Sequence, residues 1–350
     1  MSQAAEAAAA KVSAADGSLL EVDDLISHYP VPRGLLGAMM RRPRLTVKAV
    51  DGVTFSVAAG EMVALVGESG CGKTTTAQTV IRMVANQGGS IRFDGAEIGE
   101  LSPGQLRPLR REIQIIYQDP YESLDPRFTV RDTIEEPIRV HSLVPRKEDR
   151  EAKVYEAMER AGLTPPELFI DRYPHELSGG QRQRVAIAAA LVLEPKLLIA
   201  DEPVSMLDVS VRAGILALLD GLRREGMGVL MITHDLSTAA HFADRIAVMY
   251  LGRIVEEGPA RDVVRNPQHP YTKALISVVP RRDPDQRAFP QILTGETPNP
   301  VRVPPGCRFH PRCPVAEERC KETDPELRAL DGVAVGHRAA CILLGPPSGP

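Results

Sequence analysis

The sequence predicts an α/β fold built on a central parallel sheet, with an antiparallel β subdomain, an inserted helical subdomain and a small C-terminal appendage rich in cysteine and proline. Three observations support this prediction. A glycine-rich segment joins a short apolar run to a helix-like stretch near residue 70. Further apolar runs have the length and composition of buried parallel strands. Residues from about 119 to 177 read as mainly helical.

The glycine-rich segment lies between a predicted strand at 61–66 and a predicted helix at 75–84. Residues 67–74, GESGCGKT, fit the phosphate-loop pattern G-x-x-x-x-G-K-[ST] of P-loop NTPases. Glycines let successive N–H groups turn toward one anion, and the following helix adds the positive end of its dipole. A plain glycine-rich turn before a helix is the alternative. The strand, the complete pattern and the helix together favour a nucleotide-phosphate site.

Two side chains of this loop have separate expected roles. Lys73 can reach the β- and γ-phosphates as a point charge, and the Thr74 hydroxyl is placed to bind Mg²⁺. We expect the Cys71 side chain to point away from the phosphates, and we assign it no reactive role. The loop residues predicted to form the nucleotide site are Gly67, Ser69, Gly70, Cys71, Gly72, Lys73, Thr74 and Thr75.

Hydrolysis requires polar groups at the same edge of the sheet. Asp201 follows the apolar run 196–200 and would hold Mg²⁺ directly or through water, while Glu202 could polarise the attacking water as general base. An acidic pair that caps a surface strand is the alternative, which the accompanying phosphate loop disfavours. His234 follows a predicted strand at 228–233 and could contact the γ-phosphate and hold the water, although a histidine after a strand is more often structural.

The remaining elements complete the expected architecture. Residues 19–25, 48–57 and 90–93 read as strands of an antiparallel edge sheet. We interpret the insert at 30–46 as a solvated loop, with contact to lipid headgroups or a membrane partner as the alternative. The clearest helix is 149–161, where apolar residues recur at helical spacing. The parallel sheet is expected to contain 61–66, 113–117, 196–200 and 229–233.

Composition and charge narrow the class of protein. The 350 residues suit one large domain plus an appendage, and a hydrophobic content of 43% allows a substantial core. The net charge of −4 argues against broad nucleic-acid binding. No apolar stretch reaches the about 18 residues of a spanning helix, and the N-terminus lacks the features of a signal peptide. We therefore expect a cytosolic chain that reaches a membrane only through partners.

The motif series resembles that of the ATP-binding subunits of ABC transporters. Residues 177–181, LSGGQ, match the signature of that family, and Gln118 matches its Q-loop. Residues 205–208, SMLD, resemble its D-loop. Met206 and Val204 stand where alanine and threonine are commoner in the family, and neither changes a group that would touch phosphate or metal.

The resemblance covers residues 18–340 and implies an active site shared between two chains. In the family, the signature forms a second anion cradle that binds the γ-phosphate held by the opposite subunit. The resemblance also implies that Gln118 contacts Mg²⁺ and, with Asp208, senses the γ-phosphate and the opposite site. Tyr29 falls where the family stacks an aromatic ring on adenine, with His28 as a neighbouring candidate. The signature residues carried over are Ser178, Gly179, Gly180 and Gln181.

A finer resemblance is to the ATPase subunits of oligopeptide, dipeptide and nickel importers. It rests on residues 117–127, 200–203, 266–275 and 306–314. It implies an ATP-hydrolysing subunit that powers uptake of peptides or similar small nutrients at the cytoplasmic face of the inner membrane. The implied partners are a second ATPase subunit (a copy or a paralogue), two transmembrane permeases and an extracytoplasmic substrate-binding protein, with no nucleic acid.

The expected domain division follows from the same resemblance. Residues 1–17 form a disordered tail, 18–265 the ATPase domain with its helical subdomain at about 119–185, and 266–345 a C-terminal domain of the importer group. A nickel or glutathione importer, or an exporter, is an alternative that the ATPase core cannot separate. A soluble ABC ATPase acting on nucleic acid or the ribosome is disfavoured, because the chain has one cassette and no sustained heptad pattern.

Four of the five cysteines lie in the C-terminal appendage: Cys307, Cys313, Cys320 and Cys341. Disulfides are disfavoured in a cytosolic protein. Zinc commonly takes cysteines in pairs about two to four residues apart, and such pairs are absent here. An iron–sulfur cluster takes four thiolates at wider spacing, and the related importer subunits suggest a [4Fe–4S] cluster with a structural role. Free thiols are a further alternative. Three arginines fit either a thiolate cluster or a solvated surface: Arg308, Arg312 and Arg319.

Overall fold

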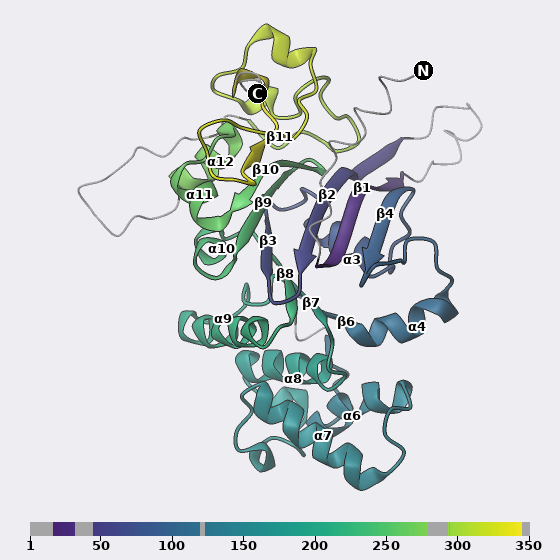
Figure 1. Cartoon of the computed structure of the whole chain (residues 1–350). Coiled ribbons are helices and arrows are strands. Elements are labelled where there is room, and N and C mark those ends of the chain that lie inside the picture. Colours follow the sequence, from purple (N-terminus) through teal and green to yellow (C-terminus); the bar gives the residue numbers. More distant parts are fainter. Residues whose placement is uncertain (1–16, 32–44, 120–122, 279–292, 294, 345–350) are drawn as a thin grey trace.

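The structure is a computed structural model that describes residues 17–31, 45–119, 123–278, 293 and 295–344. Nearly all of the expected N-terminal tail, most of the insert at 30–46 and part of the loop after Gln118 lie outside these residues. Figure 1 shows a helical subdomain at one end of the molecule, two sheets in the middle and, at the opposite end, the described part of residues 266–344, which we call the C-terminal segment.

A mixed sheet forms the centre of the molecule (Figure 1). Its strands β9, β3, β8, β7 and β6 are neighbours and run parallel, which confirms the predicted parallel sheet. The register pairs Val66 with Thr233 and Asp201 with Ile232, so the carboxyl ends of β3, β7 and β8 meet at one edge. In sheet order the described strands are β11 (Arg328–Ala329), β12 (Arg338–Ala339), β10 (Arg253–Pro259), β9 (Arg245–Tyr250), β3 (Met62–Val66), β8 (Gly228–Thr233), β7 (Leu197–Asp201) and β6 (Ile113–Ile116).

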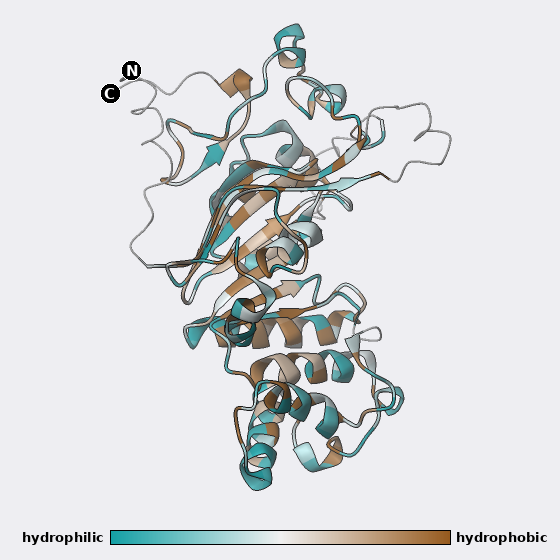
Figure 2. Ribbon diagram, turned by 90° about the vertical axis from the view of Figure 1, so that its right-hand side faces the viewer, coloured by the Kyte–Doolittle hydropathy of each residue, from teal (hydrophilic) through white to brown (hydrophobic). Residues whose placement is uncertain are grey.

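A second sheet is antiparallel, as the sequence predicts. Among the described residues its order is β2 (Thr46–Ala58), β1 (Ser18–Pro30), β4 (Gly88–Phe93) and β5 (Ala96–Glu97). Apolar residues of this sheet, among them Leu20 and Phe55, join Val63 and Leu65 of β3 in one buried cluster. Figure 2 shows the apolar residues following the strands through the middle of the molecule, where this cluster lies.

The helices cover the sheets and build the separate subdomain. The helical subdomain consists of α6 (Val130–Val140), α7 (Lys147–Arg160) and α8 (Gly179–Leu191). Its helices bury residues at helical spacing, among them Val154, Ala157 and Met158 of α7. The other described helices are α3 (Lys73–Val80), α4 (Pro103–Glu112), α9 (Val209–Arg224), α10 (Leu236–Phe242), α11 (Ala260–Arg265) and α12 (Pro270–Ser277).

Short 3₁₀ helices complete the described elements: η1 (Pro166–Leu168), η2 (Pro174–Glu176), η4 (His310–Arg312), η5 (Glu318–Lys321) and η6 (Ile342–Leu344).

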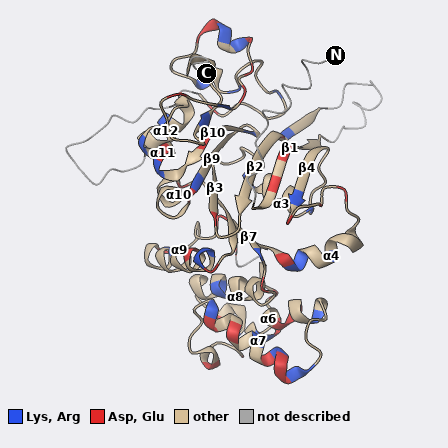
Figure 3. Ribbon diagram, viewed as in Figure 1, with Lys and Arg blue, Asp and Glu red and all other residues tan. Residues whose placement is uncertain are grey.

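Charges of both signs alternate over the helical subdomain (Figure 3). Some of them join its helices: Arg131 donates to Glu151 at 2.5 Å, and Arg150 donates to Glu135 at 2.7 Å. The Glu135 side chain is only 9% exposed, so its pair with Arg150 is screened less than a surface pair.

The sequence reading misplaces one helix end and omits several strands. The helix after the phosphate loop ends at Val80 rather than at residue 84, because the chain turns through Arg82 with a φ of +59°. The expected elements stop at Thr233, but β9 lies next to β3 and completes the parallel part of the sheet. The run that forms β9, RIAVMY, is short and mostly apolar, which is the ordinary sequence signal of a buried strand.

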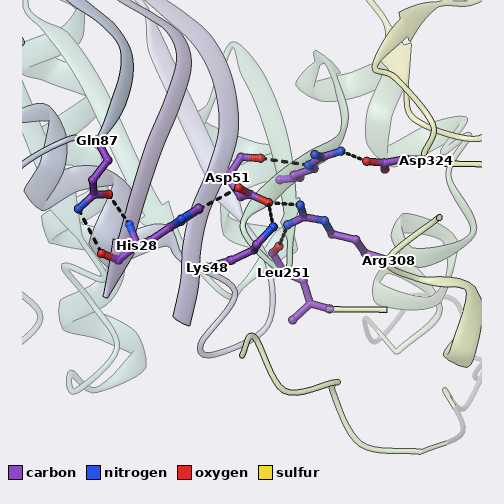
Figure 4. A network of polar contacts seen from close by, with 8 residues as sticks. His28, Lys48, Asp51, Gln87, Leu251, Arg308 and Asp324 are labelled. Carbon is purple, nitrogen blue, oxygen red and sulfur yellow. Dashed lines mark hydrogen bonds and ion pairs between the residues drawn. The ribbon is translucent and has the colours of Figure 1, made fainter. Parts of the chain in front are cut away.

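The C-terminal segment contacts both sheets. Its strand β12 pairs with β10 and extends the central sheet. Arg308 donates to the carboxylate of Asp51 on β2 and, at 2.5 Å, to the carbonyl of Leu251. Arg253 bridges the backbone carbonyl of Asp51, at 3.0 Å, and the carboxylate of Asp324, at 2.5 Å. Figure 4 shows Asp51 at the centre of this network, between β2 and the C-terminal segment.

Candidate functional site

The phosphate loop has two positions that only glycine can occupy. Gly72, at the start of α3, has a φ of +111°, and a Cβ there would lie 2.1 Å from the carbonyl oxygen of Ala49. A Cβ on Gly67 would lie 2.3 Å from the carbonyl oxygen of Met249. The loop is therefore closely fitted between β2 and β9, with its backbone amides at the start of a helix.

Lys73 lies against the loop with its side chain almost completely buried. Its ammonium group donates to the carbonyl oxygens of Gly67, at 2.8 Å, and Glu68, at 3.0 Å. The Cys71 thiol is 2% exposed, and burial raises its pKa. A buried thiol with a raised pKa is a poor nucleophile.

The two acidic residues at the end of β7 lie in different environments. Asp201 is 3% exposed, and burial raises its pKa while a hydrogen bond with Thr74 opposes that rise. The Oδ1 atom of Asp201 is buried without a hydrogen-bond partner in the part of the chain that the structure describes. A buried oxygen that lacks a partner, beside the Thr74 hydroxyl, is a donor set that fits Mg²⁺.

Glu202 occupies a strained backbone position that directs its side chain to His234. Its φ is +47°, in the left-handed region that non-glycine residues rarely adopt. Its amide donates to the carbonyl of Ile232 at 2.9 Å, which holds this conformation against β8. The Glu202 Oε2 atom lies 3.1 Å from Nδ1 of His234. A carboxylate paired with an imidazole can accept a proton from water and orient that water.

One open cleft of about 630 Å³ brings most of the predicted residues together. Tyr29, Gln118, Glu202 and His234 line it with the phosphate loop. A neighbouring pocket of about 550 Å³ shares Thr74 and Gln118 with this cleft and adds Asp201. The loop residues that line the cleft are Ser69, Gly70, Gly72, Lys73, Thr74 and Thr75.

Sequence reasoning missed some residues of the cleft wall and left one choice open. Val47, Ala49 and Pro300 also line the cleft. Pro300 carries no motif signal, because it reaches the cleft only when the C-terminal segment folds back, and its carbonyl accepts the amide of Lys48 at 3.1 Å. His28, the alternative to Tyr29, instead directs its Nε2 to Asp51 at 2.8 Å.

The signature residues lie apart from this cleft. Ser178 precedes α8, and its hydroxyl accepts the amide of Gln181 at 3.3 Å, while its own amide donates to the Gln181 side chain at 2.9 Å. Ser178 is exposed, and Gly180 packs against Val211 of α9. Asp208 is exposed at the start of α9. The described lining of the cleft and of its neighbouring pocket contains none of Ser178, Gly179, Gly180, Gln181 and Asp208.

The four cysteines of the C-terminal segment line one small pocket. Cys307, Cys313, Cys320 and Cys341 surround it together with Phe309 and neighbouring residues. Burial raises the pKa of Cys307 to about 11. No disulfide joins the cysteines, all of which are described. No group of three or more histidine, cysteine, aspartate or glutamate side chains within the described ranges is arranged to hold a metal ion. The expected metal centre is therefore not supported by the arrangement of the thiols.

No helix within the described part of the chain is long and apolar enough to cross a membrane.

Comparison with known proteins gives matches over nearly the whole chain. The family model "ABC transporter" matches residues 50–205, and "Oligopeptide/dipeptide transporter, C-terminal region" matches 255–320. The oligopeptide transport ATP-binding protein AppF of Bacillus subtilis is 46% identical over 93% of this chain and 97% of its own length. OppF of Escherichia coli, with the same description, is 46% identical over 94% of this chain and 97% of its own length.

Solved structures give the same fold. A dimeric structure of the ATP-binding cassette MJ0796, in a post-hydrolysis state bound to ADP and Pi, matches with a TM-score of 0.60 and 28% identity. The match covers 69% of this chain and 99% of that one. Another is cbiO1 from Clostridium perfringens, part of the ABC transporter complex cbiONQ, with a TM-score of 0.59 and 29% identity over 71% of this chain and 92% of its own. These matches confirm the predicted P-loop ATPase fold.

Proposed function

Because the chain belongs to the ATP-binding subunits of ABC transporters, we propose that it hydrolyses ATP to power the import of peptides. One observation carries this proposal: a single cleft gathers the phosphate loop, Gln118, Glu202 and His234. Relatives that match almost end to end are described as oligopeptide transport ATP-binding proteins, which supports peptides as the cargo.

The motif residues of the cleft and its neighbouring pocket have distinct parts in the proposed reaction. The loop amides and Lys73 bind the phosphates, and Tyr29 at the cleft wall offers its ring to the adenine. Thr74 and Asp201 would hold Mg²⁺, which neutralises charge on the phosphates. Glu202 accepts a proton from the attacking water, and His234 orients that water beside the γ-phosphate. Positioning and electrostatics supply most of the catalysis, since phosphoryl transfer needs little covalent chemistry from the protein.

The position of the signature supports a site that two chains complete. Ser178, Gly179 and Gly180 are at the start of a helix, where backbone amides favour an anion, yet they do not line their own chain's cleft. We propose that they bind the γ-phosphate held by a second ATPase subunit, either a copy or a paralogue. Asp208, exposed nearby, would sense that opposite site. Two permeases and an extracytoplasmic binding protein complete the proposed complex at the cytoplasmic face of the inner membrane.

A Glu202→Gln variant tests the hydrolytic assignment. In the complex purified from membranes, the variant should bind ATP, remain closed on its partner subunit and lose hydrolysis by about 10²- to 10⁴-fold. Glu225→Gln is a matched control, because Glu225 is an exposed carboxylate that pairs with Arg160 at 2.8 Å. Normal turnover by the Glu202 variant would contradict the base assignment. The subunits and cargo of the same preparation test the proposed partners.

We further propose that the four-cysteine pocket takes a [4Fe–4S] cluster. The number and type of side chains around the pocket, four thiols, support this proposal, because such clusters take four thiolates. The thiols as the structure places them form no metal-binding group, so the proposal requires them to move closer together when a cluster binds. Protein purified without oxygen should then be brown and contain iron and sulfide, and Cys320→Ser should lose both. A colourless, iron-free wild-type preparation would contradict this proposal.

A further inference from the structure

The second residue of the phosphate loop, Glu68, is fixed through its side chain, its amide and its carbonyl. The carboxylate accepts two bonds from Arg312, at 2.7 Å and 3.1 Å, and one from the Thr297 hydroxyl at 2.9 Å. The amide donates to the hydroxyl oxygen of Tyr271 at 2.9 Å. The carbonyl accepts the Lys73 ammonium at 3.0 Å. All the polar groups of one loop residue are thus held in place.

Three of these partners come from the C-terminal part of the chain. Tyr271, Thr297 and Arg312 lie 203, 229 and 244 residues from Glu68 in sequence. They belong to α12, to the described chain around residue 297, and to η4. The shape of the loop therefore depends on a segment that contributes nothing to its strand or its helix.

Two of the C-terminal anchors, Tyr271 and Arg312, are buried. The Tyr271 ring lies 4.8 Å from that of Tyr250 and 5.4 Å from that of Phe309, and all three residues are at most 1% exposed. The Arg312 side chain is 8% exposed, and that of Glu68 is 27% exposed. A bidentate arginine–carboxylate pair in such surroundings is shorter, stronger and more directional than a surface ion pair.

Electrostatics keep this contact charged at neutral pH. Burial raises the pKa of Glu68, but the hydrogen bonds from Arg312 and Thr297 outweigh burial and leave the pKa below its usual value. The hydrogen bond to Glu68 raises the pKa of Arg312 further above neutrality. Both groups are therefore charged over the physiological pH range.

We propose that Arg312 is a positioning residue of the ATP site: acting on Glu68 together with Tyr271, it holds the phosphate loop in the shape that nucleotide binds. The inference rests on the proposed ATP site and goes beyond it, because it assigns the C-terminal segment a part in setting ATP affinity. Without the contact, the loop samples other conformations. The apparent affinity for ATP is then the intrinsic affinity multiplied by the fraction of molecules in the binding-competent conformation.

Removing the guanidinium tests this positioning role. In Arg312→Met, the Kd for ATP measured on the full chain should rise about tenfold, and the KM of the complex should rise equally while kcat at saturating ATP stays within about twofold. Arg312→Lys keeps the charge but loses the two-pronged geometry, so it should recover part of the affinity. If Arg312 only stabilised the fold, the opposite changes in KM and kcat would be expected, because a smaller folded fraction lowers the apparent kcat and leaves KM unchanged.

A double-mutant cycle with Glu68→Gln isolates the contact itself. The double variant should bind ATP no more weakly than the weaker single variant, because the two changes remove the same interaction. Arg319→Met is the matched control: Arg319 lies in the same segment but pairs with Glu317 at the surface, at 2.7 Å. Its ATP affinity should equal that of the wild type. If Arg312→Met does not fold, Arg312→Lys and Tyr271→Phe preserve the packing and carry the same test.

Three results would overturn the inference: an unchanged Kd in the folded Arg312 and Tyr271 variants, additive losses in the double variant, or an equal loss in Arg319→Met. A Lys73→Ala variant measured in parallel separates this inference from the proposed function. Unchanged ATP binding in Lys73→Ala would refute the ATP site itself. Loss of binding there, with normal binding in the Arg312 variants, would refute only the positioning role.

Discussion

Replacing Arg308 by methionine should destabilise the protein by removing the main partner of Asp51. Arg308 is 7% and Asp51 is 12% exposed at the side chain, and Figure 4 shows the guanidinium directed at the carboxylate. Methionine keeps much of the volume of the side chain. Among the described residues it leaves the Asp51 carboxylate paired only with His28, at 2.8 Å, and Lys48, at 3.5 Å. The Asp51 carboxylate then stays largely buried, and its remaining partners offset much less of the free-energy cost of removing it from water.

The magnitude follows from the shift in the pKa of Asp51. Burial acts to raise this pKa, but hydrogen bonds and charge from Arg308, with help from His28 and Lys48, lower it from 3.8 to about 2. A shift of this size corresponds to about 2 kcal/mol of folding free energy. The lost bond from Arg308 to the carbonyl of Leu251 adds about 1 kcal/mol. We therefore expect Arg308→Met to lower the free energy of unfolding by about 3 kcal/mol at pH 7.

Urea unfolding at several pH values measures this effect. A carboxyl group with a depressed folded-state pKa stabilises the fold fully above about pH 4 and loses that contribution as the pH falls through about 2. The difference between wild type and Arg308→Met should therefore be constant from pH 7 to 5 and shrink below pH 4. Lys48→Met is the control, since Lys48 is 44% exposed and its pair is worth about 0.5 kcal/mol. Equal destabilisation by the two variants would refute the reasoning.

Three further predictions concern single residues. Gly72→Ala should abolish ATP binding in a nucleotide titration, because its Cβ would lie 2.1 Å from the Ala49 carbonyl oxygen. Burial lowers the pKa of His269 from 6.5 to about 4, so the fold is most stable above pH 6.5 and loses this contribution as the pH falls toward 4. In His269→Asn, which keeps the helix cap, the melting temperature should therefore change less between pH 6.5 and 4 than in the wild type. Glu256→Ala should lower the free energy of unfolding in urea by about 3–5 kcal/mol, because it leaves the buried His337 and two backbone amides without their hydrogen-bond partner.

The sequence predicts the centre of this molecule well because the local pattern and the fold agree there. A strand that is buried on both faces, a fixed glycine pattern and a helix leave few alternatives for residues 62–80, and Asp201 follows from the next apolar run. Glu202 and His234 then meet because parallel strands bring their carboxyl ends to one edge.

The contributions of the C-terminal segment could not be predicted in the same way. Pro300 and Arg312 reach the phosphate site through contacts that span most of the chain. Pro300 belongs to no motif, and the segment 306–314 that contains Arg312 pointed to the importer family and the cysteines, not to the phosphate loop. Proline-rich stretches with little regular structure carry almost no positional signal. The cysteine spacing likewise indicated that the thiols gather, but it could not give their separation around the pocket.

The short hairpin formed by β11 and β12 has a consequence for solubility. Without it, the central sheet would finish at β10, whose outward N–H and C=O groups would be open to pairing with another molecule. Ala339 and Arg338 occupy that border opposite Glu256 and Glu257, and the two-residue length of β11 leaves little template beyond it. A chain cut before residue 328 would thus be prone to aggregate through strand addition even if it still bound nucleotide.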